Sequence, residues 1–172
     1  MKLSIGVRDV SVTPLVDAEY PIVLKKLIKG AKVRCLCSLF IVDPLPRKDS
    51  ENRVYSLLME LRNAKWRGVD TRLLIGGSRT NVAIAELSQF SRDLGNSLGV
   101  PSCWLTGKKQ RGSHVKMVII DDNVLMGSHN WSPGAFLNQT QDSLIVQSAA
   151  FAEVQSVFFE KQWKRGEYEN LA

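Results

Sequence analysis

The stretch HVKMVIIDDNVLMGSHNW, residues 114–131, is the most informative part of the chain. His114 and Lys116 are two residues apart, so on a β-strand their side chains lie on the same face. The apolar run that follows continues the strand, and the turn-forming residues at 121–123 end it. The second apolar run predicts a partner strand. The pattern therefore predicts a β-hairpin that carries polar groups at its open end.

The length of the hairpin loop decides which side chains meet. A three-residue loop at 121–123 places Lys116 opposite Ser128 and His114 opposite Asn130, which gives four polar side chains on one face. A two-residue loop shifts the register by one and places His129 there instead. We expect the three-residue loop and keep the second register as the alternative.

Imidazole, ammonium, hydroxyl and amide groups together suit a phosphate. Imidazole acts as a nucleophile or general acid and base near neutral pH, and lysine stabilises negative charge on phosphoryl oxygens. Gly127 allows a close approach of the backbone. A lone histidine on a strand is usually a surface residue, but Lys116 lies within an apolar run, where an unpaired charge is costly.

The motif resembles the HKD motif of the phospholipase D superfamily. The match follows the order His114-x-Lys116-x4-Asp121 and then Gly127-Ser128-x-Asn130, and the resemblance extends over the whole chain. One departure is the spacer between Asp121 and Gly127, which has five residues here and more commonly six in the family.

This resemblance implies a mechanism that uses neither metal nor cofactor. In the family, two such motifs meet: one histidine attacks phosphorus and the other protonates the leaving oxygen. The resemblance implies that His114 is this catalytic histidine and that Lys116 and Asn130 hold the phosphate. It also implies that Ser128 assists and that Asp121 has a more structural role. The chain has one motif, so the resemblance implies a homodimer with an isologous interface.

A second departure concerns the group that orients the histidine. Family members often have a glutamate about eleven residues after the motif's asparagine, and the matching residue here is Gln141, followed by Asp142. Glutamine can accept the imidazole hydrogen bond but brings no charge. Asp142 substitutes for it only if the register slips by one.

The rest of the chain predicts an α/β fold, with a mixed β-sheet and helices on both faces, in a single domain over residues 1–172. Helices are expected after Asp17, which we expect to cap the first, around residues 54–67, around residues 84–98 and over 148–163. The last is expected to bury Phe151, Val154, Val157 and Phe158. Strands are expected at 2–8, 33–42, 71–75, 100–105, 115–120, 124–126 and 142–147.

Composition limits the possible function classes. No apolar stretch is long enough to cross a bilayer, and the first residues lack a secretory signal, so we expect a cytoplasmic protein without a membrane anchor. Three cysteines form no disulfide framework, and their spacing with the two histidines does not resemble a zinc site. The net charge of +6 favours a polyanionic partner.

The substrate stays open between classes. Lys108, Lys109 and Arg111 precede the His114 strand and are expected to bind a nucleic-acid backbone, with a second cluster at Lys25, Lys26, Lys29 and Lys32. Short single-motif members also resemble the nuclease branch. We therefore expect an endonuclease acting on DNA or RNA. The alternatives are a phospholipid phosphodiesterase and a non-catalytic nucleic-acid-binding member.

Overall fold

A computed structural model describes residues 10–45, 52–78, 80–107 and 112–170. The predicted strand at 2–8 lies outside these residues. In chain order the elements are β1 (Ser11–Val16), α1 (Glu19–Gly30), β2 (Arg34–Leu39), α2 (Arg53–Trp66), β3 (Asp70–Ile75), α3 (Val82–Ser97), β4 (Ser102–Trp104), β5 (Lys116–Ile120), β6 (Asn123–Gly127), α4 (Pro133–Leu137), β7 (Asp142–Gln147) and α5 (Ala149–Asn170).

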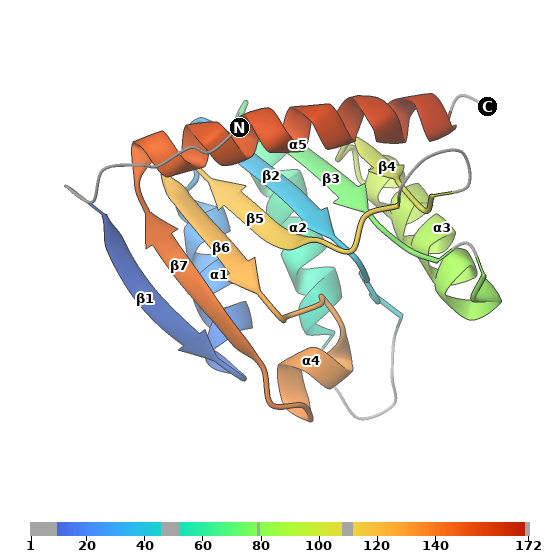
Figure 1. Cartoon of the computed structure of the whole chain (residues 1–172), viewed down its shortest axis with the longest axis horizontal. Helices are drawn as coiled ribbons and strands as arrows, with labels where there is room; N and C mark the ends of the chain where they lie inside the picture. The colour runs from blue at the N-terminus through green and yellow to red at the C-terminus, as the bar shows by residue number, and fades with distance from the viewer. Residues whose placement is uncertain (1–9, 46–51, 79, 108–111, 171–172) are drawn as a thin grey trace.

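The described strands form one mixed sheet in the order β1-β7-β6-β5-β2-β3-β4. β2, β3 and β4 run parallel, whereas β5, β6, β7 and β1 are joined by antiparallel pairings. The α1 and α2 helices cover one face of the sheet, and the long α5 helix crosses the other (Figure 1). This arrangement confirms the predicted mixed sheet with helices on both faces.

The sheet is apolar on both faces because each face is covered. Cys37, Val118 and Leu125 belong to the core beneath α1 and α2, while Met117 and Val124 belong to the core beneath α5. Neighbouring residues of a strand alternate between these two cores, as the pleat requires. The near-continuous apolar runs of β2 and β5 follow from this double burial.

The α5 helix is longer than predicted, and it buries a different set of side chains. Val157 and Phe158, which were expected to be buried, are 49% and 45% exposed, and the buried side chains are instead those of Ala152, Ser156, Phe159, Gln162, Trp163, Gly166 and Glu169. Small residues explain the error. A Cβ at Gly166 would lie 2.7 Å from the Cys103 Sγ atom, so the helix lies too close to the sheet for larger side chains there.

The predicted capping role of Asp17 is wrong. The residue before α1 is Ala18, which makes no capping hydrogen bond with its side chain. Asp17 has a φ of 47°, and its carboxylate instead accepts a hydrogen bond of 2.7 Å from the Gln141 backbone N–H. Asp17 therefore ties the start of α1 to the segment that enters β7.

Candidate active site

Both halves of the motif lie at the same end of the β5–β6 hairpin, where the strand ends meet. β5 begins at Lys116 and β6 ends at Gly127, and the two strands are antiparallel, so these ends are adjacent (Figure 1). The end of β2 lies beside them, since Leu39 is paired with Lys116. The start of β7 lies on the other side, with Ser143 opposite Gly127.

The predicted three-residue loop is wrong. Ile120 is paired with Asn123, which leaves a two-residue turn of Asp121 and Asp122. Asp121 has a φ of 50°, a left-handed conformation that aspartate tolerates and that closes a tight turn. The register is therefore the alternative one, with a two-residue loop.

The register does not decide the faces of Ser128 and Asn130, because the ladder between β5 and β6 ends before them. The chain leaves the sheet after Gly127 and approaches the segment that follows β2. There Trp131 is bridged to Val42 and donates its backbone N–H to the Ile41 carbonyl at 3.0 Å.

Residues 39–42 therefore lie between the two halves of the motif. The Phe40 ring contacts the His114 ring, with 4.2 Å between centroids, and the Lys116 ammonium lies 5.1 Å from the centre of the same ring. The backbone of Ile41 contacts the residue that follows Asn130. The site is thus built on the extension of β2 beyond its paired part.

His114 and Lys116 form the reactive pair at this end of the hairpin. His114 is exposed, and its Nδ1 atom lies 3.4 Å from the Lys116 Nζ atom. Partial desolvation, and secondarily the Lys116 charge, lower the pKa of the His114 imidazole below its usual value. Desolvation also lowers the pKa of the half-buried Lys116. The lowered pKa favours the neutral form of the imidazole, which is the form that attacks as a nucleophile.

Ser128 contacts β7 rather than His114. Its hydroxyl donates to the Gln141 Oε1 atom at 2.5 Å and accepts from the Asp142 backbone N–H at 3.0 Å. The remaining hydrogen bonds of Gln141 within the described residues go to Gln139 and Asp17, so none orients the His114 ring. The exposed Asp142 contacts Ser128 through its backbone.

Asn130 keeps hydrogen-bonding capacity free. Its side-chain Oδ1 atom is buried without a partner among the described residues. A buried amide oxygen without a partner is rare in native structures and often marks a functional site. The four polar side chains thus share one end of the hairpin, but no hydrogen bond within the described residues joins the Ser128 group to the His114 group.

His129, the second histidine, is a structural residue. It is 1% exposed and stacks on the Tyr20 ring with 4.2 Å between centroids. Its Nδ1 atom lies 2.8 Å from the Ser143 hydroxyl, and its Nε2 atom 3.1 Å from the Asp17 carbonyl. Because a carbonyl can only accept, Nε2 carries the proton and Nδ1 accepts from the serine. Burial lowers the pKa of His129 and keeps it neutral.

Asp121 lies at the opposite end of the hairpin from His114. Its carboxylate accepts hydrogen bonds of 2.8–3.1 Å from the backbone N–H groups of Lys32, Val33 and Arg34. These bonds hold the pKa of the carboxyl below its usual value, against the effect of burial. Asp121 thus lies apart from the reactive side chains and anchors the start of β2.

The predicted substrate-binding residues Lys108, Lys109 and Arg111 lie outside the described residues. Sequence reasoning missed Phe40, which lies far from the motif along the chain, and Gly76. A Cβ at Gly76 would lie 2.2 Å from the Ser113 carbonyl oxygen, so glycine lets the chain pass closely on its way to His114.

Comparison with known proteins identifies the family. A family model described as "Cardiolipin synthase, PLD-like domain" matches residues 24–163. The chain belongs to the phospholipase D superfamily. A search of curated proteins gives no match. The chain is therefore a phosphodiesterase-type member of that superfamily.

Solved structures share the fold at low identity. Nuc from Salmonella typhimurium, a phospholipase D family member, is 19% identical with a TM-score of 0.67, over 92% of this chain and 97% of that one. NucT from Helicobacter pylori is 16% identical with a TM-score of 0.66, over 91% and 98%. Phosphatidylserine synthase from Haemophilus influenzae is 18% identical with a TM-score of 0.67, over 92% of this chain and 37% of that one.

Among the described residues, no helix is both long enough and apolar enough to cross a membrane.

Proposed function

We propose that this protein is a metal-independent endonuclease that forms a phosphohistidine at His114 in an active site shared by two copies of the chain. One observation carries the proposal. The chain has two histidines, and His129 is buried with both ring nitrogens engaged. One copy therefore offers one reactive imidazole, whereas the two-step reaction uses two. A second copy supplies the other.

The first step forms a bond between phosphorus and a ring nitrogen of His114. The phosphorus–oxygen bond to the leaving group breaks, and the protonated imidazole of the second copy gives its proton to the leaving oxygen. In the second step that imidazole takes a proton from water. The resulting hydroxide attacks phosphorus, the phosphorus–nitrogen bond breaks, and His114 is restored.

Lys116 changes partner during this reaction. In the free protein its ammonium lies beside Nδ1 of His114. The phosphoryl oxygens are better acceptors for an ammonium than a neutral ring nitrogen, because the charges are opposite. Substrate binding therefore draws Lys116 towards the phosphate, which frees the imidazole and stabilises the charge that develops on the phosphoryl oxygens.

A nucleic-acid substrate is supported by the charge of the chain and by its likeness to Nuc and NucT. The net charge is +6, and three basic residues of the predicted substrate-binding loop, 108–111, directly precede the His114 segment. The chain also shares its fold with Nuc and NucT, with TM-scores of 0.67 and 0.66. A lipid substrate is the second possibility within the same chemistry.

The test is turnover of labelled single-stranded DNA, labelled RNA and an aryl phosphodiester in excess EDTA, with His114→Ala in parallel. Cleavage of a nucleic acid that survives EDTA and is lost in the variant supports the proposal. Cleavage that EDTA abolishes in both proteins contradicts it. Turnover of phosphatidylcholine or phosphatidylglycerol alone would assign the lipid class instead.

A non-catalytic role is the other candidate, and Gln141 motivates it, because its side chain binds Ser128 and orients no imidazole. Salt-sensitive binding of single strands, equal in wild type and His114→Ala and without turnover of any phosphodiester, would support this role. A cleavage rate in wild type alone would exclude it.

A further inference from the structure

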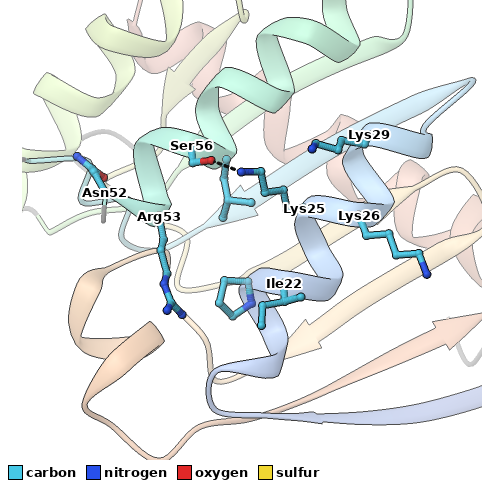
Figure 2. Close-up of a pocket in the computed structure, with 9 residues that line it drawn as sticks. Ile22, Lys25, Lys26, Lys29, Asn52, Arg53 and Ser56 are labelled. Carbon is cyan, nitrogen blue, oxygen red and sulfur yellow. Dashed lines mark hydrogen bonds between the residues drawn. The ribbon is translucent and has the colours of Figure 1, made fainter. Parts of the chain in front are cut away.

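A groove of about 570 Å³ lies between α1 and α2, on the side of the sheet opposite α5 (Figure 2). Ile22, Lys25, Lys26 and Lys29 line it from α1, and Arg53 and Ser56 line it from α2. The Ile22 side chain is 66% exposed, which leaves an apolar surface at the entrance of a basic groove. None of the chemistry proposed for His114 uses these residues.

The cations of the groove are only partly neutralised. The Lys25 ammonium donates to the Ser56 hydroxyl at 2.6 Å, which is a neutral partner, and Lys29 lies 3.7 Å from a Glu60 carboxylate oxygen. Lys26 and Arg53 form no ion pair within the described residues. Figure 2 shows the Lys26 and Arg53 side chains extending away from the Lys25–Ser56 hydrogen bond.

The groove begins beside the motif. Tyr20 directly precedes the first groove residues of α1, and its ring stacks on His129 and lies 6.1 Å from the Phe136 ring of α4. At the other wall, α2 contacts α4, the short helix that follows the motif, and Figure 2 shows Arg53 near it. One end of the groove therefore adjoins the segment that carries Ser128 and Asn130.

We propose that this groove binds the phosphate backbone of the single nucleic-acid strand whose cleaved phosphodiester reaches His114. The inference rests on the proposed function and extends it with a second binding surface. Basic side chains along a groove track a backbone, and Lys25 and Lys29 are one helical turn apart, which puts their side chains in a row. Ile22 offers an apolar contact for a sugar or base at the entrance.

The shape of the groove favours a single strand. Packed helices have axes about 8–10 Å apart, so the space between two of them matches one extended strand better than a wider duplex. A membrane surface fits less well, because membrane-binding helices present their apolar residues on an outward face and their lysines at its border. Here the lysines line the recess itself.

The test measures binding separately from cleavage. A 5′-fluorescein 12-nucleotide single strand is titrated with protein in the His114→Ala background, and anisotropy is read between 50 and 300 mM salt. The groove variant is Lys26→Gln with Arg53→Gln. The matched control is Lys161→Gln with Lys164→Gln, which removes the same charge from exposed positions on α5. Thermal melts confirm that each variant is folded.

We expect the groove variant to bind roughly twenty-fold more weakly at 0.1 M salt, with the slope of log K against log salt reduced by about 1.4, because each phosphate contact on a single strand contributes about 0.7. The control should change affinity less than about threefold, since it removes only distant charge. Equal losses in the two variants, or none in either, would overturn the inference.

The result for the groove can be distinguished from the result for the proposed function. Loss of oligonucleotide binding in the groove variant alone supports the groove even if wild type cleaves no phosphodiester. Cleavage by wild type with unchanged oligonucleotide binding in the groove variant overturns the groove and leaves the proposed function standing. A groove variant that loses binding to phosphatidylglycerol vesicles but not to the oligonucleotide would also overturn it.

Discussion

The two ends of the β5–β6 hairpin differ in how far their polar groups are satisfied. At the turn, the Asp121 carboxylate accepts three backbone hydrogen bonds and joins the hairpin to the start of β2. At the open end, His114 is exposed beside a lysine, and the Asn130 amide oxygen is buried without a partner among the described residues. The hydrogen-bonding capacity of the Asp121 carboxylate is thus used inside the protein, whereas that of the Asn130 oxygen is not.

The difference separates residues that hold the fold from residues available for chemistry. A group whose hydrogen bonds are all made inside the protein contributes stability, and it has little capacity left for a ligand. A group with unused capacity beside a charge costs stability, and such groups concentrate at functional sites. The motif thus combines two kinds of residue in one sequence pattern.

The largest expected effect is on activity at the open end. His114→Ala should lower phosphodiester cleavage by roughly 10³- to 10⁴-fold or more, because it removes the nucleophile. The melting temperature should stay within about 1 °C of wild type, since His114 is exposed and no core group depends on it. Initial rates and calorimetry on the same preparations check both. Strong destabilisation of the variant would mean that His114 stabilises the fold, as Asp121 does at the turn.

Mixing experiments test whether one active site needs the open end, and thus His114, of one copy of the chain or of two. If each active site needs His114 from two copies, wild type mixed with an equal amount of His114→Ala should fall to roughly a quarter of the undiluted activity after subunit exchange. A self-sufficient chain would keep half. The control is dilution with an equal amount of buffer-matched albumin. A linear dependence of activity on the wild-type fraction would refute the shared site.

An intermediate effect is expected at the turn, on stability rather than on chemistry. Asp121→Ala should lower the free energy of unfolding by about 2 kcal/mol at pH 7, because three backbone donors lose a charged acceptor. Asp121→Asn should lose less, since it keeps one oxygen and tolerates the φ of 50°. Urea denaturation measures both, and the exposed neighbour Asp122→Ala is the control.

The same carboxylate gives a pH dependence with a defined sign. The pKa of Asp121 is lowered in the folded protein, so its contribution is complete above the unfolded value near 3.8 and is lost as the pH falls through the folded value. The stability difference between wild type and Asp121→Asn should accordingly shrink in acid. A difference that stayed constant below pH 3 would mean that the hydrogen bonds do not depend on the charge.

The sequence was sufficient for the fold class and for the position of the motif, because strong apolar periodicity and a specific residue order carry that information. It was insufficient where close packing decides. The α5 prediction selected Val157 and Phe158, but small residues such as Gly166 face the sheet. The β1 strand was missed because it is an edge strand with Pro14 in its middle, which weakens the strand pattern.

Several connections within the candidate site could not be predicted from the sequence. The hairpin register depended on one residue of turn length, and the left-handed conformation of Asp121 decided it. The contact of Phe40 with His114 joins positions far apart in the chain, so no local pattern could predict it. Gln141 was expected at the position of the group that orients the histidine, but its side-chain oxygen accepts a hydrogen bond from Ser128.

The smallest expected effect concerns the titration of His114 itself. Lys116→Gln removes the ammonium that helps to lower the pKa of His114, so the midpoint should rise towards the ordinary histidine value while the larger effect of desolvation remains. NMR titration of the imidazole Cε1–H signal measures it, with His114→Ala to distinguish the signal from that of buried His129, and Lys161→Gln as the control for net charge. An unchanged midpoint in Lys116→Gln would mean that the ammonium does not act on the ring in solution. His114 and Lys116 would then come together only when a phosphate binds both side chains.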